Sequence, residues 1–177
     1  LIAHSCQVPA PLARLPLSGE ECLRLVGYGR PGAERALHST DNRVVMIAEA
    51  RIQLDEFHVY EVLVPPFFRT TPGRRRIAVT LAFDPPARHR NARYLGSSMY
   101  FRLLRNCSLD AIVAAFRRPD AGDRKAKLEL RWKTQLMTGA AHRDAGTLQR
   151  GGWTIRRKPD HQEGEPLHLV VVSERGW

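Results

Sequence analysis

Hydrophobic and polar residues alternate in a series of short segments after residue 43 of this 177-residue chain. Alternation with a period of two places apolar side chains on one face of a strand, so these segments predict β-strands. They cover residues 43–50, 57–64, 75–84, 94–104, 147–158 and 166–175. Pro65, Pro66, Pro72 and Gly73 interrupt the pattern and predict turns. Residues 127–137 are ambiguous, because their apolar residues alternate while their composition also suits a helix.

Six or seven strands with few helices between them predict a mainly β fold, an antiparallel β-sandwich of jelly-roll-like type. The clearest helix in this part covers residues 108–118. Ser108 is its N-cap candidate. Its apolar positions are 109, 112, 113 and 116.

The first 42 residues have helical spacing instead. Residues 1–8 predict the end of an apolar helix, which Pro9 and Pro11 prevent from continuing. Ser18 and Glu21 have the spacing of a capping box and predict one or two helical turns after them.

The stretch GYGRPGAERAL, residues 27–37, predicts a tight turn followed by a short helix. Gly27 and Gly29 permit positive φ on either side of Tyr28, so the turn can direct this aromatic ring inward. Pro31 suits the first position of the helix, where its missing N–H costs nothing. The helix has its apolar face on Ala33, Ala36 and Leu37.

Composition bounds the class of protein. The hydrophobic fraction of 43% suffices for a packed core, and the apolar runs are too short to span a bilayer, so no membrane partner is expected. Cys6, Cys22 and Cys107 are too few and too irregular for a disulfide framework, which favours the cytoplasm, with secretion as the alternative. The chain begins at Leu1 without features of a signal peptide, and we expect a further segment upstream.

The net charge of +10 is concentrated in one stretch, because residues 69–105 contain nine arginines and one acidic residue. The candidate binding residues flank one predicted strand and are Arg74, Arg75, Arg76, Arg88, Arg90 and Arg93. Arginine forks there could face an acidic protein surface or nucleic acid, or simply water. Nucleic acid is the less favoured ligand, because neither stacking aromatics nor a known reading module accompanies the cluster.

Patterns typical of catalysis or metal binding are missing from the sequence. It contains neither a G-x-S-x-G elbow nor an H-x-x-x-H pair. We therefore assign no catalytic residue, no metal ligand and no cofactor.

Residues 27–37 resemble the closing segment of the catalytic domain of subtilisin-like serine proteases, which typically reads Gly-x-Gly-x-(Val/Ile)-(Asn/Asp)-Ala-x-x-Ala. Gly27, Gly29, Ala33 and Ala36 match this pattern, whereas Pro31 and Gly32 depart from it. The preceding LIAHSC is similar to a late helix of the same domain. Residues 43–177 resemble the β-rich C-terminal extension of a bacterial subgroup, notably in HSTDNRVVMIAE, LDEFHVYEV, RRRIAVTLAFDPP, GTLQRGGWTIRR and LVVVSERGW.

The resemblance implies that the catalytic aspartate, histidine and serine and the oxyanion-hole asparagine all lie upstream. No Gly-Thr-Ser is present, so none of these residues can be assigned here. The resemblance thus implies the C-terminal part of a serine endopeptidase, inactive alone, with residues 1–42 ending the catalytic domain and 43–177 forming an accessory sandwich.

Three partners are expected on this interpretation. They are the upstream catalytic domain, an AAA-type ATPase of the kind found beside some relatives, and a second copy of the chain. The second copy would cover an apolar face made by Leu1, Ile2, Leu23, Leu25 and Tyr28. The alternative is a free-standing basic module that binds an acidic protein or nucleic acid.

Overall fold

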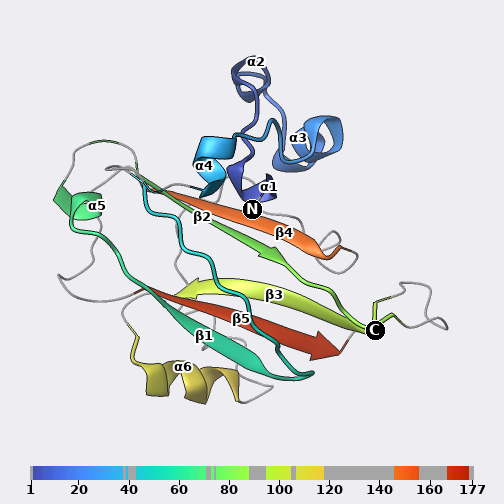
Figure 1. Cartoon of the computed structure of the whole chain (residues 1–177), viewed down its shortest axis with the longest axis vertical. Coiled ribbons are helices and arrows are strands. Elements are labelled where there is room, and N and C mark those ends of the chain that lie inside the picture. Colours follow the sequence, from blue (N-terminus) through green and yellow to red (C-terminus); the bar gives the residue numbers. More distant parts are fainter. Residues whose placement is uncertain are drawn as a thin grey trace.

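Two antiparallel β-sheets lie one above the other in the computed structural model of the chain (Figure 1). The structure describes residues 2–37, 39, 43–70, 73, 75–87, 95–104, 107–117, 146–155 and 167–175. One sheet has the order β1-β5-β3, and the other pairs β2 with β4. The strands are β1 (Phe57–Val62), β2 (Arg75–Ala82), β3 (Ser97–Leu104), β4 (Leu148–Ile155) and β5 (Leu167–Arg175). The predicted mainly β fold with antiparallel sheets is thereby confirmed.

The alternation of each strand decides which side chains lie between the sheets. In the three-stranded sheet, Phe101 of β3 is opposite Val171 of β5, and Leu103 is opposite Leu169. These residues form one hydrophobic cluster with Trp153 of β4 and with apolar residues of β2. The two sheets therefore share a core.

A glycine and a glutamine of β4 shape the contact between the sheets. The ring of Phe101 lies over Gly151, where an added Cβ would be 3.0 Å from two ring carbons. The same ring meets Trp153 at a centroid separation of 6.2 Å, edge to face. Gln149, which is 1% exposed, donates from its amide to the carbonyl oxygen of Met99. β4 thus contributes both packing and a polar link to β3.

Helix α6 (Leu109–Phe116) covers the opposite face of the three-stranded sheet (Figure 1). Ser108 accepts a hydrogen bond from the N–H of Ala111, which confirms it as the N-cap. Ile112 is fully buried in a cluster with Leu104 and Val170. Within the predicted apolar face, Ile112 is buried, whereas Leu109, the first residue of the helix, is 55% exposed.

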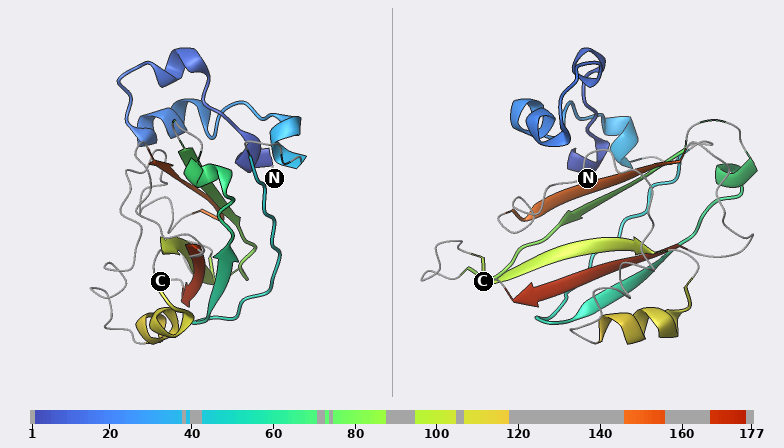
Figure 2. Two further views of the ribbon diagram at one scale, coloured as in Figure 1. Left: turned by 90° about the vertical axis from the view of Figure 1, so that its left-hand side faces the viewer. Right: turned by 180° about the vertical axis from the view of Figure 1, so that it is seen from behind.

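Four short helices precede the strands and lie on the outer face of the β2–β4 sheet (Figures 1 and 2). They are α1 (Ile2–Ser5), α2 (Ala10–Ala13), α3 (Gly19–Val26) and α4 (Ala33–Leu37); a further turn, α5 (Phe67–Thr70), follows β1. Helix α4 begins later than predicted. Gly32 supplies its first accepting carbonyl, so Pro31 precedes the helix instead of opening it.

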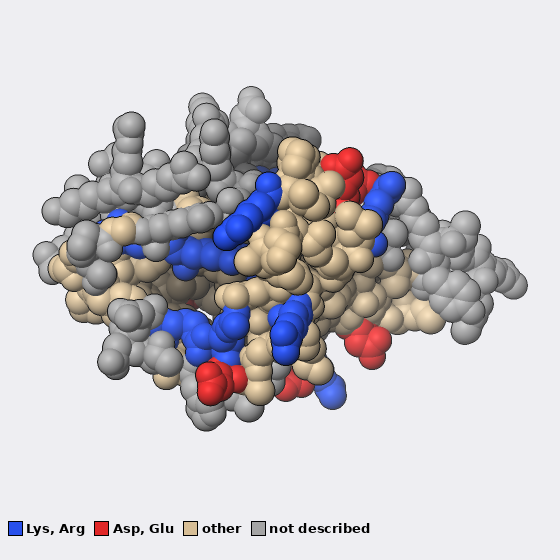
Figure 3. Space-filling model, turned by 90° about the horizontal axis from the view of Figure 1, so that it is seen from above, with Lys and Arg blue, Asp and Glu red and all other residues tan. Residues whose placement is uncertain are grey.

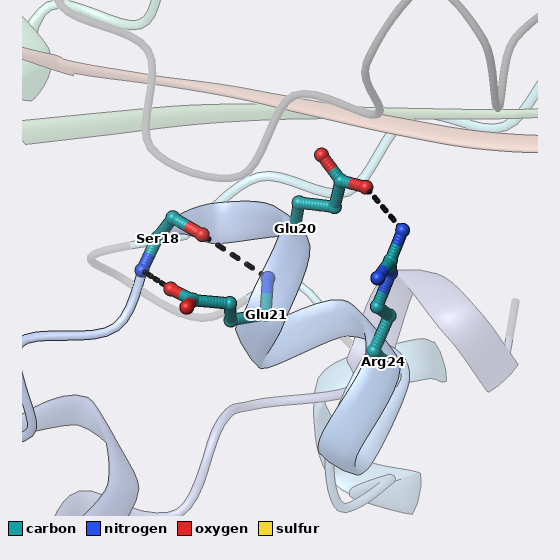
Figure 4. Close-up of polar contacts among 4 residues, drawn as sticks. All are labelled: Ser18, Glu20, Glu21 and Arg24. Carbon is teal, nitrogen blue, oxygen red and sulfur yellow. Dashed lines mark hydrogen bonds and ion pairs between the residues drawn. The ribbon is translucent and has the colours of Figure 1, made fainter.

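The capping box predicted for α3 is confirmed (Figure 4). The hydroxyl of Ser18 accepts from the N–H of Glu21 at 3.2 Å, and the carboxylate of Glu21 accepts from the N–H of Ser18 at 2.8 Å. These hydrogen bonds hold the pKa of the Glu21 carboxyl below its usual value of 4.5. On the same helix, Glu20 of the first turn and Arg24 form an exposed ion pair at 2.8 Å.

The strand predicted over residues 43–50 is wrong for the single chain. Arg43 forms only a single β-bridge, and residues 44–50 belong to an extended stretch that runs past both sheets to β1 (Figure 1). Alternation gives a strand its two faces, but the strand itself requires a hydrogen-bonded neighbour. The ambiguous segment 127–137 lies outside the described residues.

Candidate functional site

The candidate site lies where the N-terminal helices meet the outer face of the β2–β4 sheet. Arg150 of β4 is central to it and is only 5% exposed. Its Nη1 donates to the carbonyl oxygen of Ala3 at 3.0 Å, and its Nη2 donates to that of His4 at 3.3 Å. A strand arginine thus satisfies two carbonyls of α1 and fixes this helix on the sheet.

His4 adds a second link between α1 and the sheet. Its Nδ1 and the hydroxyl of Thr80 on β2 are hydrogen-bonded at 3.2 Å. Burial, followed by the positive charge of Arg150, lowers the pKa of His4 below its usual value of 6.5, and Arg43 and Arg76 act in the same direction. The neutral imidazole is therefore favoured at this position.

The charges that act on His4 define a basic cluster of Arg43, Arg76 and Arg150. Arg43 is also tied to the helices, because its Nη2 donates to the carbonyl oxygen of Glu34 at 3.0 Å. Burial and the charge of Arg76 lower the pKa of Arg150. Seen from above, Lys and Arg side chains gather near the middle of the face that carries the N-terminal helices (Figure 3).

Of the predicted arginine cluster, Arg75 and Arg76 are described, whereas Arg74, Arg88, Arg90 and Arg93 lie outside the described residues. Arg75 and Arg76 are consecutive in β2, opposite Ile155 and Thr154 of β4. Consecutive strand residues point to opposite faces. Arg76 therefore lies on the outer face of the sheet with Thr80, whereas Arg75 lies on the inner face with Ile77.

The turn at residues 27–29 holds the helices together and reaches the sheet. Gly27 ends α3, and its N–H donates to the carbonyl oxygen of Leu23 at 2.8 Å. Gly29 has a φ of 91°, and a Cβ there would lie 2.3 Å from the carbonyl oxygen of Gln7. Glycine is thus required both by the backbone conformation and by the close approach of another segment.

Two antiparallel backbone hydrogen bonds account for that approach. The N–H groups of Gln7 and Arg30 each donate to the other's carbonyl oxygen at 2.9 Å. The hydroxyl of Tyr28 then donates to the carbonyl oxygen of Leu148 on β4 at 2.9 Å. The turn therefore contacts the same strand as α1.

Ser5 joins α1 to α4. Its hydroxyl donates to the carbonyl oxygen of Ile2 at 2.8 Å and accepts from the N–H of Gly32 at 3.2 Å. Ser5 and Ala36 are both buried, whereas Ala33 is exposed. Ser5 thus links α1 to the residue that precedes α4.

The predicted apolar face of the helices is only partly covered. Ile2 and Leu25 are 74% and 64% exposed, whereas Leu23 and Tyr28 are half-buried. Leu1 lies outside the described residues. A dimer through this face remains a prediction.

Groups with other chemistry are sparse in the described part of the chain. Cys6 and Cys22 are buried and Cys107 is half-buried, all as free thiols. No three His, Cys, Asp or Glu side chains among the described residues are grouped closely enough to hold a metal ion. No helix formed by these residues is long and apolar enough to cross a membrane.

Over 180 aligned residues the chain is 37% identical to a protein of Sinorhizobium fredii (strain NBRC 101917 / NGR234) that carries the name "Uncharacterized protein y4bN". The match covers the whole chain but only 42% of that relative's length. No family model and no solved structure matches the chain.

Proposed function

We propose that this chain is the non-catalytic C-terminal portion of a longer subtilisin-like serine endopeptidase. Its two sheets would stabilise the end of the catalytic domain and position substrates or partners. The observation that carries the proposal is the attachment of the N-terminal helices to β4 through Arg150. On this account, the upstream catalytic domain is the chain's main partner, and the chain alone does not hydrolyse peptides.

The energetics of the attachment support this role. A buried guanidinium is costly unless its donors are satisfied, and Arg150 directs two of them to α1. Tyr28 and His4 add hydrogen bonds to the same sheet. A flexible linker between two domains would need none of these contacts. A segment that holds a neighbouring domain on the sheet would need them.

The proposal extends to the architecture. The cluster of Phe101, Leu103 and Trp153 between the sheets supports an antiparallel β-sandwich for residues 43–177. Closure of the jelly-roll type, the cytoplasm as the compartment and an AAA-type ATPase as a further partner remain predictions from the sequence.

The proposal can be tested on the longer relative. Full-length Sinorhizobium protein is compared with a version that lacks the stretch matched by this chain, using a fluorogenic peptide and thermal unfolding. We expect the full-length protein to hydrolyse the peptide and the deletion to lower both activity and melting temperature. Full activity with unchanged stability after the deletion would refute an accessory role, and a full-length protein without hydrolysis would refute the protease.

A second candidate function is a basic binding module for an acidic protein. It is favoured by the basic cluster of Arg43, Arg76 and Arg150, whose charges act together on His4. Arg76 is the exposed member, so Arg76→Ala should weaken binding of fluorescent poly-glutamate while Arg24→Ala should not. If the chain binds DNA instead of poly-glutamate, and the affinity falls steeply as salt rises, the ligand of this site is nucleic acid. Binding of neither would exclude this candidate.

A further inference from the structure

Residues 43–50 have the pattern of a strand, but apart from a single β-bridge at Arg43 they have no strand beside them in the described part of the chain. Their sequence, RVVMIAEA, is apolar at most positions. Val44, Met46 and Ile47 are 45%, 50% and 68% exposed. In Figures 1 and 2 the connection that contains them is the outermost element on its side of the two sheets. An exposed, extended, apolar segment is a template for pairing with another strand.

One N–H group on one edge of this segment is already hydrogen-bonded. The N–H of Val45 donates to the hydroxyl of Ser39 at 3.1 Å. Successive residues of an extended chain direct their N–H and C=O groups to opposite edges. The backbone groups of Val44, Met46 and Ala48 therefore face the other edge, and among the described residues no backbone hydrogen bond involves them.

We propose that residues 43–50 pair antiparallel with the same residues of a second copy of this chain, about a two-fold axis at Met46. The hydrogen-bonded pairs are then Met46 with Met46 and Val44 with Ala48. Val45 is opposite Ile47 in a non-hydrogen-bonded pair. This arrangement uses only the open edge and is a self-complementary interface, as a two-fold axis requires.

Charge complementarity selects this register. With the axis at Met46, Arg43 of each copy is opposite Glu49 of the other, whereas an axis at Ile47 would place Arg43 opposite Arg51. Opposite charges across a strand pair stabilise it, and like charges oppose it.

A ribbon of two short strands is marginally stable, so the dimer should form reversibly and its population should rise with concentration. Sedimentation velocity over a range of concentrations should show a monomer passing to a dimer. Glu49→Arg should shift the dissociation constant to higher concentration, because it places two arginines opposite each other. Glu61→Arg, a charge reversal at an exposed position of β1, is the matched control and should have no effect.

Disulfide trapping tests the register itself. Because the Cα atoms of a non-hydrogen-bonded pair are close enough for a disulfide, a mixture of Val45→Cys and Ile47→Cys chains should cross-link under mild oxidation. Val45→Cys mixed with Leu63→Cys is the control, since Leu63 is 67% exposed, about as much as Ile47. The parent chain controls for its three native thiols.

Cross-linking that is several-fold faster in the Val45–Ile47 mixture than in the control would support the proposal. A monomer at every concentration would overturn it. A dimer whose dissociation constant is unchanged by Glu49→Arg and that cross-links equally in both mixtures would also overturn it. Such a dimer must use another surface, such as the apolar face with Ile2 and Leu25.

Discussion

Nη1 of Arg150 lies 3.0 Å from the carbonyl oxygen of Ala3, although 147 positions separate the two residues in the sequence. This contact ties the beginning of the described chain to β4. It explains how four short helices, each too short to be stable alone, keep a defined place on the sheet. The proposed function and the first prediction both depend on it.

Replacing Arg150 should loosen the helices without disturbing the sheets. Arg150→Met keeps much of the length and apolar stem of the side chain but leaves the carbonyls of Ala3 and His4 without this donor. We expect a loss of about 1.5–3 kcal/mol in the free energy of unfolding by urea. Arg24→Met, at an exposed ion pair, is the control and should cost about 0.3–0.5 kcal/mol. Equal effects of the two substitutions would contradict the central place of Arg150.

The two glycines of the turn should differ in their tolerance of alanine. Gly27 has a φ of 58° but nothing within 4 Å of an added Cβ, so Gly27→Ala should cost only backbone strain of about 1–3 kcal/mol. Gly29→Ala adds a clash with the Gln7 backbone to the same kind of strain. We expect it to be the more damaging substitution, as measured by thermal unfolding. An equally stable pair of variants would show that residues 7 and 29 are not in contact.

The packing of Phe101 on Gly151 predicts a compensating pair of substitutions. Gly151→Ala inserts a methyl group 3.0 Å from the ring and should cost about 1–3 kcal/mol through overpacking. In the Gly151→Ala background, Phe101→Leu should be less costly than in the parent chain, because the smaller side chain makes room. Urea unfolding of the four chains gives the coupling energy. Strict additivity would mean that the two residues do not touch.

His4 should make the stability of the chain depend on pH near neutrality. Its pKa is lowered in the folded chain, first by burial and then by Arg150, so the unfolded chain binds a proton more readily. The contribution of neutral His4 is therefore present above about pH 6.5 and is lost as the pH falls through the folded pKa. His4→Gln should flatten this decline between pH 6.5 and about 5, before most carboxylates titrate. His58→Gln is the control, and a decline that persists in His4→Gln would assign the effect to another group.

Local chemistry made several elements predictable. Ser18 with Glu21, and Ser108, are caps whose partners lie three residues away, so the sequence contains the whole interaction. The alternation over residues 57–64 and 75–84 likewise predicts β1 and β2, because the strand period is fixed by the backbone.

Contacts between distant segments were not predictable in the same way. Arg150 lies in a predicted strand, but nothing in its neighbourhood distinguishes it from an arginine that faces water. Its role depends on α1, which reaches it only in the folded chain. The strand prediction for residues 43–50 is wrong for a related reason. The pattern of apolar residues does not show whether a neighbouring strand is available for pairing.

The most direct test of the central claim is labelling with a fluorophosphonate probe that reacts with activated serines. The probe is applied to this chain and to the full-length Sinorhizobium relative, and the labelled residue is located by mass spectrometry. We predict that this chain stays unlabelled and that the relative is labelled at one serine outside the stretch matched by this chain. A folded relative without label, or a label on a serine within the matched stretch, would contradict the account of this chain as the non-catalytic part of a serine endopeptidase.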